Sequence, residues 1–382
     1  MRLVVLSCLA AVLALAPTRA RGPAGNEILV SSADELVRAL RAPVRDVILQ
    51  LAPGIYTLTP SAAIDSSCGN CEHPDTLIPI TVGLAISGRG VRIVGPKNGK
   101  ATIVTHAGYG IYFDDCIDCL IEHVTITGGE RGTAGATDAA IVVKHSLVTI
   151  HDCVIADNAG MGICAREGSV LNVERNEILR CSSGIALYRA NNVTIRHNLI
   201  DGHGMGIGAA WNARATIERN HVRGCTDGIG IGADADVVVR ANIVERMMGV
   251  GISVRGGGGG RPRAVIEENV VYDCGGPGIS IHRRTPYAAN EPRGKLVRNI
   301  VVHVEPGSAL DLSAVPDGFV ITGNAFYDNH DAGDSSGDLP REMFWRKRRG
   351  WTRTYRNTEV GVDGQHKFYE SAFLTRYGRW FD

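Results

Sequence analysis

The sequence predicts an all-β protein, a right-handed parallel β-helix in which one turn of the solenoid uses about 22 residues. Three observations predict this fold. Gly-Ile pairs recur every 22 residues, beginning at positions 162, 184, 206 and 228. Asparagines recur at the same interval of 22, at positions 176, 198, 220 and 242. Between these positions, short β-branched and apolar runs are joined by Gly, Asn and Asp, as in strands connected by turns.

The repeat extends beyond this regular centre. Gly110-Ile111 and Ala140-Ile141 precede it, and Gly251-Ile252 and Gly278-Ile279 follow it. The asparagines continue at positions 269, 299 and 324, with spacings that stretch to 27, 30 and 25 residues. Single turns therefore carry insertions, which a solenoid accommodates as longer loops. Leu-x-x-Leu-x-Leu phrases are absent, which excludes a leucine-rich repeat.

The regular asparagines are expected to be structural. Strands of successive turns lie about 4.8 Å apart, so identical residues stack into ladders. Stacked Asn side chains can hydrogen-bond along such a ladder and satisfy the backbone of the turns. We therefore expect them to build the scaffold rather than to perform chemistry.

Residues 1–20 have the pattern of a secretory signal peptide. Arg2 precedes an apolar run from Leu3 to Ala16, and Ala20 supplies a small residue for cleavage. The apolar run is too short for a comfortable membrane span. We expect an exported chain, secreted or periplasmic, with no stable membrane insertion.

Residues 21–60 are expected to cap the first turn. Ser32 followed by acidic residues, with Leu36, Val37 and Leu40 on one face, predicts a short amphipathic helix. A solenoid has to cover its first open edge, because an exposed edge recruits other strands.

The remaining chain divides into the β-helix, residues 61–330, a Gly/Asp/Ser-rich linker, residues 331–340, and a C-terminal segment, residues 341–382. That last segment holds 10 of the 21 aromatic residues, and 10 Lys or Arg against 5 acids. It suits either a cap packed on the last turn or a basic, aromatic arm for an anionic polymer. Export and the overall balance of 40 basic and 40 acidic residues argue against nucleic acid as a partner.

Two phrases near the start of the solenoid resemble sequences of a known family. The phrases Ala52–Tyr56 (Ala-Pro-Gly-Ile-Tyr) and Val91–Pro96 (Val-Arg-Ile-Val-Gly-Pro) resemble exported β-helix proteins of the pectate-lyase superfamily, above all the chondroitinase B and alginate lyase type. The resemblance covers about residues 28–330 and implies an acidic polysaccharide as partner. Alginate C5-epimerases of this fold carry an Asp-Pro-His-Asp motif, which is absent here; the nearest string is Asp328–Asp331.

Nine cysteines remain after removal of the signal peptide, and two pairs are closely spaced: Cys68 with Cys71, and Cys116 with Cys119. In an oxidising compartment these are disulfide candidates, within each pair or across the two. The spacing also suits a four-thiolate zinc site or unpaired thiols.

The repeat also predicts which residues share a face. Successive strand residues point to opposite sides, so positions one and three after each repeat glycine should point inward, and positions two and four outward. The inward positions are uniformly apolar. The residues at position two become smaller along the repeat and reach glycine at Gly208 and Gly230, which predicts a shallow trough. Positions four and five carry the candidate site residues. At position four these are Lys144, Arg166, Tyr188, Arg255 and His282; at position five, Arg189, Trp211 and Arg283.

These residue types suit β-elimination on a uronate polymer, which needs a base and a cation to neutralise the carboxylate beside the abstracted proton. Lys144 is the candidate base, Arg166 the neutralising cation and Tyr188 the acid for the leaving oxygen. His282 with Arg255 is a second candidate centre.

Arg189, Trp211 and Arg283 are candidate substrate-binding residues, because flat rings suit sugar faces and guanidinium groups suit carboxylates. No cofactor is required, although Ca²⁺ held by Asp114, Asp115 and Glu167 is an alternative source of positive charge. The opposing interpretation is that such side chains only keep the outer face of a β-helix soluble.

Two functions therefore follow from the sequence. The first is an exported protein that acts on an acidic polysaccharide by β-elimination; the second is a non-catalytic scaffold that binds carbohydrate or a partner. Glycoside hydrolysis is disfavoured, because the outward columns hold one carboxylate, Asp114, where a pair is needed.

Overall fold

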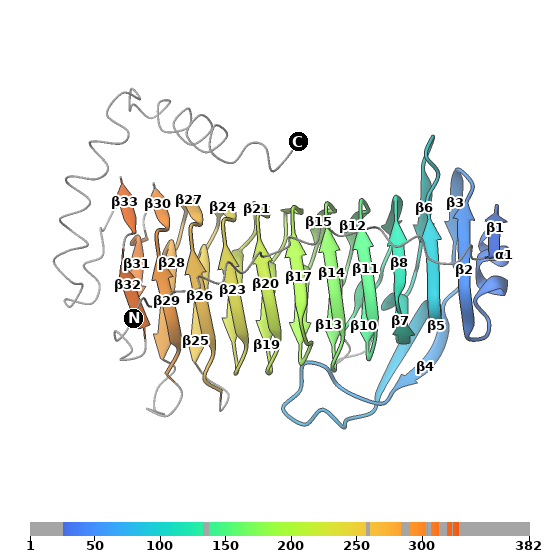
Figure 1. Ribbon diagram of the computed structural model, residues 1–382, viewed down its shortest axis with the longest axis horizontal. Helices are drawn as coiled ribbons and strands as arrows, with labels where there is room; N and C mark the ends of the chain where they lie inside the picture. The colour runs from blue at the N-terminus through green and yellow to red at the C-terminus, as the bar shows by residue number, and fades with distance from the viewer. Residues whose placement is uncertain are drawn as a thin grey trace, which may run out of the picture.

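The computed structural model describes residues 26–327, except 133–136, 257–259, 284–290, 303, 305–306, 313–318 and 323. The predicted signal peptide, the linker and the C-terminal segment lie outside the described residues. Within the described ranges, successive turns stack into one elongated parallel β-helix (Figure 1). No helix in these ranges is long and apolar enough to cross a membrane.

Each regular turn contributes one strand to each of three faces. The first face consists of β7 (Tyr109–Ile117), β10 (Ala139–Lys144), β13 (Met161–Arg166), β16 (Ser183–Tyr188), β19 (Met205–Ala210), β22 (Asp227–Gly232), β25 (Ile252–Gly256), β28 (Ile279–Arg283) and β31 (Leu310–Leu312). The second consists of β1 (Asn26–Val30), β2 (Val44–Leu51), β8 (Cys119–Glu122), β11 (Leu147–His151), β14 (Val170–Glu174), β17 (Val193–Arg196), β20 (Arg214–Glu218), β23 (Asp236–Arg240), β26 (Arg263–Glu267), β29 (Arg293–Val297) and β32 (Phe319–Thr322).

The third face is a separate 11-stranded sheet. Its strands are β3 (Gly54–Thr57), β6 (Ala101–Val104), β9 (Val124–Thr127), β12 (Val154–Asn158), β15 (Glu177–Cys181), β18 (Leu199–Asp201), β21 (His221–Arg223), β24 (Ile243–Met247), β27 (Val270–Cys274), β30 (Ile300–Val302) and β33 (Ala325–Tyr327). The long strand β5 (Ile78–Val94) joins the other two faces, because it pairs with both β7 and β8.

The predicted helix is present as α1 (Ala33–Ala39) at the N-terminal end of the stack. Ser32 accepts a hydrogen bond from the Glu35 backbone N–H, and the Glu35 carboxylate accepts one from the Ser31 backbone N–H. Leu36 and Leu40 are buried, whereas Val37 is 38% exposed. The parallel stack begins earlier than the predicted boundary at residue 61, since β1, β2 and β3 already pair with solenoid strands.

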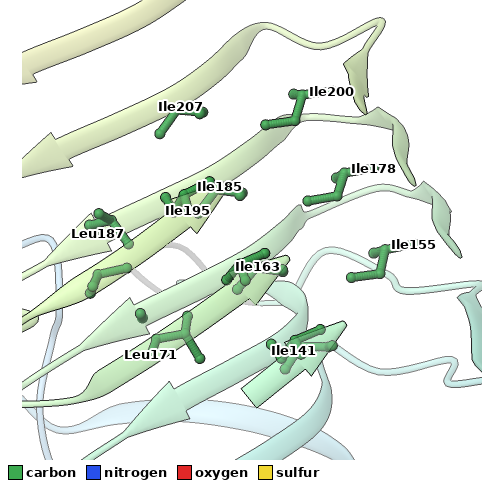
Figure 2. Packing of buried hydrophobic residues seen from close by; sticks show 14 of the residues in the cluster. Ile141, Ile155, Ile163, Leu171, Ile178, Ile185, Leu187, Ile195, Ile200 and Ile207 are labelled. Atoms are coloured by element: carbon green, nitrogen blue, oxygen red, sulfur yellow. The ribbon is translucent and has the colours of Figure 1, made fainter. Parts of the chain in front are cut away.

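The core lies inside the three faces, and the inward positions predicted from the repeat are confirmed. Ile163, Ile185 and Ile207 are fully buried and stack above one another, and Ile178 and Ile200 meet them from the third face (Figure 2). Burial of side chains of this kind contributes about 2 kcal/mol each, which is the main source of stability in such a fold.

The repeat glycine is required by close packing between turns. A Cβ on Gly206 would lie 2.6 Å from the carbonyl oxygen of Gly228, its counterpart one turn on, and 2.5 Å from Val222. Larger residues do not fit there without displacing the backbone. The glycine of the recurring Gly-Ile pair is therefore required for packing between turns and does not mark a functional site.

The asparagine ladder is continuous, and its predicted structural role is confirmed. The side chain of Asn220 donates to the backbone carbonyl of Ile195 and to the side-chain oxygen of Asn242. Its own side-chain oxygen accepts from the backbone and the side chain of Asn198. The same bonds recur up to Asn324, and the ladder side chains are buried.

The second face carries a ladder of alternating charge. Paired positions on successive strands are occupied by Glu122, His151, Glu174, Arg196, Glu218, Arg240 and Glu267. His151 Nε2 lies 2.9 Å from Glu122, and Arg196 lies 2.8 Å from Glu174. Opposite charges across paired strands stabilise a sheet, and like charges would repel.

Replacement of one ladder asparagine is expected to destabilise the whole solenoid. In Asn220→Ala, the buried backbone groups at Ile195 and Asn198 lose their partner, at a cost of ~3 kcal/mol in the free energy of unfolding. Urea unfolding measures this change. Asn191→Ala, at an exposed position, is the control and should unfold as the wild type does. Equal stability of the two variants would contradict the role given to the ladder.

The charge ladder predicts a pH dependence of stability. The hydrogen bond to Glu122, with Asp152 as a second partner, raises the pKa of His151 above its ordinary value. The protonated ring therefore stabilises the fold below about pH 6.5, and this contribution is lost as the pH rises through the raised pKa. In His151→Gln the stability advantage of the wild type should be largest in mild acid and shrink above neutral pH, measured by urea unfolding. Parallel curves for the two proteins would contradict this.

Candidate functional site

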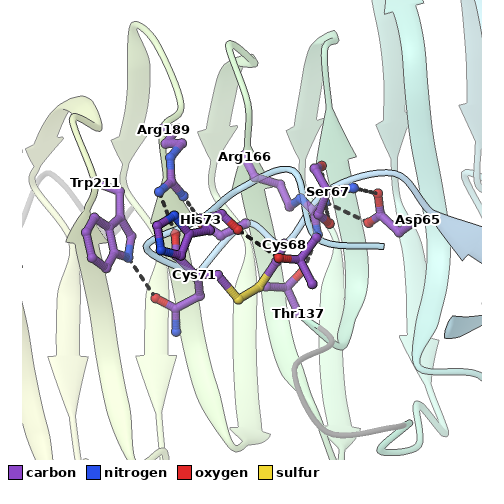
Figure 3. Close-up of a disulfide and its surroundings, with 12 residues drawn as sticks. Asp65, Ser67, Cys68, Cys71, His73, Thr137, Arg166, Arg189 and Trp211 are labelled. Carbon is purple, nitrogen blue, oxygen red and sulfur yellow. Dashed lines mark hydrogen bonds and ion pairs between the residues drawn. A yellow bond between two sulfur atoms is a disulfide. The ribbon is translucent and has the colours of Figure 1, made fainter. Parts of the chain in front are cut away.

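Residues 61–77, which precede β5, form a strap across the outer side of the first face (Figures 1 and 3). The strap begins with β4 (Ser61–Asp65), which pairs antiparallel with β5, and its remaining loop contains a Cys68–Cys71 disulfide. It does not add a regular turn to the stack. One of the two predicted cysteine pairs is therefore bonded.

The strap is packed on the solenoid by a second apolar cluster, separate from the core. Cys68 of the strap and Ile78, Ile80 and Val82 of β5 meet outward-facing side chains of the first face. Those side chains are Tyr109, Ala139, Val142 and Cys164, with Tyr112, Met161 and Tyr188 partly buried beside them. The outer side of β7, β10 and β13 is thus covered by protein.

Lys144 and Arg166 lie under the strap, so the prediction that they face solvent is wrong. The two residues are 2% and 0% exposed. Asp65 of the strap, also fully buried, lies between them, 2.7 Å from Lys144 Nζ and 2.7 Å from Arg166 Nη2. Lys144 and Arg166 are neighbours on successive turns, as predicted, but the Asp65 carboxylate of the same chain neutralises them.

Every nitrogen of the Arg166 guanidinium donates hydrogen bonds to neighbouring groups. Its Nε donates to Glu167 at 2.6 Å, and its Nη1 donates to the hydroxyls of Tyr109 and Thr137. Its Nη2 donates to Asp65 and to the carbonyl oxygen of Ser67. Every donor of the group has a partner, which is what a buried charge requires.

The electrostatics of this pair are set by opposing effects. Burial alone would raise the pKa of Asp65, but Arg166 and Lys144 outweigh it and hold that pKa below its ordinary value. Asp65 therefore remains ionised at neutral pH. Burial raises the pKa of Tyr188 above its ordinary value, so this phenol remains protonated and able to donate.

Beyond the strap, the predicted trough of small residues is present as an open groove. It has a volume of about 310 Å³ and runs over β16, β19, β22 and β25. Its floor includes Gly208, Gly230 and Gly232, and Tyr188 and Arg255 lie at its two ends. Because glycine has no side chain, the two consecutive strands β19 and β22 leave the space open.

Arg189 and Trp211, both predicted as binding residues, contact the strap (Figure 3), and each directly follows a groove-lining residue, Tyr188 and Ala210. Arg189 donates to the carbonyl oxygens of Gly69 and Cys71 at 2.7 and 2.6 Å. The Trp211 indole N–H donates to the side chain of Asn70, and the Arg189 guanidinium lies 5.1 Å from the Trp211 ring centre. The strap therefore holds both side chains in place.

The far end of the first face holds the second predicted centre. Arg255 and His282 are paired neighbours on β25 and β28, and Arg255 is exposed. His282 Nε2 lies 3.0 Å from a carboxylate oxygen of Asp311 on β31, and their side chains are 33% and 26% exposed. A partly exposed His–carboxylate pair beside an exposed arginine is an arrangement able to move a proton next to an anion. The side chain of Arg283 lies outside the described residues.

The chain matches the family model described as right handed beta helix region, over residues 89–207 and 138–290. These matches together span more than half of the sequence. The chain belongs to the right-handed β-helix family. The fold predicted from the 22-residue repeat, a right-handed parallel β-helix, is thereby confirmed.

Solved structures share the fold of this β-helix protein at low identity. Pectate lyase Pel9A is 12% identical, with 82% of each chain covered and a TM-score of 0.50. A mutant tailspike protein of the E. coli bacteriophage HK620, in complex with a pentasaccharide, is 12% identical, with 76% of this chain and 57% of the tailspike chain covered and a TM-score of 0.52. At these identities the likeness shows the fold alone. No curated protein matches the sequence.

Calcium remains a prediction in this β-helix protein. Asp114, Asp115 and His145 bring one ligand atom each within 4.8 Å of one another. Glu167, the third carboxylate predicted for such a site, is instead bound to Arg166. A surface cluster of this kind is common without an ion.

The second predicted disulfide is wrong. Cys116 and Cys119 are free, buried thiols at the corner between β7 and β8. Each thiol interacts with a backbone carbonyl of the preceding turn, Cys116 with Ile86 at 3.1 Å and Cys119 with Gly88 at 4.0 Å. These inward contacts satisfy the thiols in place of a bond between them.

Three site residues of the β-helix protein were missed by the sequence reasoning: Asp65, Asn70 and Asp311. Asp65 and Asn70 lie outside the repeat, and nothing local marks their contacts with residues 79 to 141 positions away. Asp311 could have been found from the repeat, because it continues the outward column of Ser253 and Ser280. The long insertion before it makes this alignment difficult to recognise in the sequence.

Removal of the Asp65 charge is expected to unfasten the strap. In Asp65→Asn, Lys144 and Arg166 stay buried without their counter-ion, which should cost ~4 kcal/mol of stability. Urea unfolding and the rate of proteolytic cleavage within residues 66–77 measure the effect. Asp75→Asn, at an exposed position of the same strap, is the control and should leave both unchanged. A wild-type cleavage rate in Asp65→Asn would contradict this account.

Proposed function

We propose that this exported β-helix protein holds an acidic polysaccharide in the groove between Tyr188 and Arg255 and acts on it by β-elimination. The observation that carries the proposal is the open groove with Tyr188 at one end and Arg255 at the other, and with His282 and Asp311 just beyond Arg255. The alternative is a scaffold that binds the same polymer and breaks nothing.

The groove suits a sugar chain for reasons of shape and chemistry. Its floor of glycine and alanine is shallow and extended, as a linear polymer needs. Trp211 offers a flat ring, which packs well on the apolar face of a sugar. Arg255 offers an exposed guanidinium, a group that pairs with carboxylates in two-point geometry.

Related folds support a polysaccharide as the polymer. One solved structure with this fold is a pectate lyase, and another was crystallised with a pentasaccharide. The function of a fold lies in its site, so these names support the class of ligand and not the reaction.

The chemistry is assigned to the second predicted centre. His282, oriented by Asp311, would take the proton from the carbon beside the uronate carboxylate, and Arg255 would stabilise the charge that develops there. The electron pair of that C–H bond forms a carbon–carbon double bond as the bond to the leaving oxygen breaks. Water supplies a proton to that oxygen.

The first predicted centre has no access to a polymer in this arrangement. Lys144 and Arg166 are ion-paired with Asp65 beneath the strap. Tyr188 faces the groove, but four strand spacings separate β16 from β28, a distance of ~19 Å. Tyr188 and His282 therefore cannot serve the same bond, and Tyr188 is assigned to binding.

The test is the formation of unsaturated uronate product, followed by its ultraviolet absorbance, from alginate, polygalacturonate and hyaluronate with and without Ca²⁺. His282→Ala and Arg255→Ala should each reduce the rate about 100-fold or more, the usual size of a lost proton-transfer or charge-stabilising group. Arg214→Ala, an exposed arginine on the second face, is the control and should retain the wild-type rate.

Binding is measured separately, by calorimetry on the same polymers. Trp211→Asn removes the ring while keeping a residue that tolerates the positive φ of 55° at this position, and it should weaken binding about tenfold. Binding without product would favour the scaffold alternative. Loss of neither binding nor product in these variants would place the site elsewhere, and absence of both in the wild type would refute the proposal.

A further inference from the structure

We infer that the groove is closed at its Tyr188 end and that the protein therefore recognises the terminus of a polysaccharide chain. This inference rests on the proposed function and narrows its ligand from a polymer in general to a chain end. It follows from the position of the strap, which lies across the same face that carries the groove (Figure 3).

The groove begins where the strap ends. Tyr188 lines the groove and also packs against the apolar cluster that fixes the strap. On the other side of Tyr188, the outward positions of β10 and β13 hold Val142 and Cys164, both 0% exposed. A polymer lying along the stack would meet protein at this point instead of continuing over the next turn.

No room for a sugar exists beneath the strap. The strap backbone at Gly69 is so close to the solenoid that a Cβ there would lie 2.9 Å from Cδ of Arg166. Asp65 contacts both buried cations at 2.7 Å. The two surfaces are in direct contact along the strap.

The strap is fastened at both ends of this contact. Asp65 binds it above β10 and β13 through buried charges. Arg189 holds two of its carbonyl oxygens, and Asn70 reaches over to the Trp211 indole. A buried ion pair, a disulfide and three hydrogen bonds make the strap a fixed wall of the groove and not a loosely attached loop.

The length of the open groove sets how much of a ligand can be held. From β16 to β25 there are three strand spacings, or ~14 Å, and a further spacing leads to His282. A ligand of a few sugar units fills this length. Its terminal unit would abut Tyr188 and the strap beside Trp211, and the chain would extend towards Arg255 and His282.

A chain lying across the stack, along the strands, would instead be bound at internal positions. The two arrangements differ in the number of protein molecules that one polymer chain can accept. Terminal recognition allows one protein per chain whatever its length, whereas internal recognition allows more on longer chains.

The experiment measures this number for the full chain, or for His282→Ala where the wild type forms product, with size-fractionated samples of whichever of alginate, polygalacturonate and hyaluronate it binds best. Calorimetry gives the protein bound per polymer chain, and light scattering on the complex checks it. We expect one protein per chain at every length. A number that rises in proportion to length overturns the inference and leaves the proposed function standing, whereas no binding to any polymer refutes both.

A groove-filling variant is the matched control. In Gly230→Trp the new side chain would fill the middle of the groove. Its Cβ would lie 3.1 Å from the flexible end of Met205 and 3.6 Å from Oγ of Ser253. Binding at one protein per chain should disappear. Gly232→Trp, in more open space, repeats the control if the first variant does not fold. Retained binding in a folded variant overturns the inference, because the chain end is then held outside the groove.

Discussion

In-register stacking is the constraint on which the rest of the structure depends. Each turn must place its backbone groups about 4.8 Å above the previous turn, so each inner position sees its own counterpart above and below. This favours residues that interact well with copies of themselves. Asparagine meets the demand because its amide both donates and accepts, and Asn198, Asn220 and Asn242 use both functions in every turn. Charged residues cannot repeat in this way, and the second face alternates Glu with Arg or His instead.

The same constraint explains what could be predicted from the sequence. Inward positions that stack on their own counterparts, such as Ile185, Ile207 and the asparagines, recur at a fixed period in the sequence. The fold and its core could be predicted from that period. The trough followed too, because Gly208 and Gly230 sit in a column whose direction the repeat fixes. The outward-facing side chains of successive strands are not constrained by stacking in this way. Whether Lys144 faces water depends on a segment 79 residues earlier in the chain, and strand alternation contains no information about it.

The strap shows how a repetitive scaffold acquires a single, defined site. Every turn of the first face is similar, so a uniform solenoid would offer a polymer many equivalent positions. Asp65 breaks this equivalence at one place, and it does so with a contact that only two adjacent turns can provide: Lys144 above β10 and Arg166 above β13. Because both cations are buried, the strap cannot slide to a neighbouring turn without leaving charges unpaired, a large penalty in a dry site. The internal carboxylate thus determines where the groove begins.

The separation of charge along the first face bears on what the groove can do. Positive charge under the strap is cancelled by Asp65 and Glu167, so it contributes little attraction at the groove itself. At the other end of the groove Arg255 is exposed, and His282 lies 3.0 Å from Asp311. An anionic chain would therefore be drawn towards Arg255 while its end is limited by the wall at Tyr188. In the proposed function, one end of the groove would select by shape and the other by charge. The pair proposed to transfer a proton, His282 and Asp311, lies towards the charged end, where a carboxylate would be held.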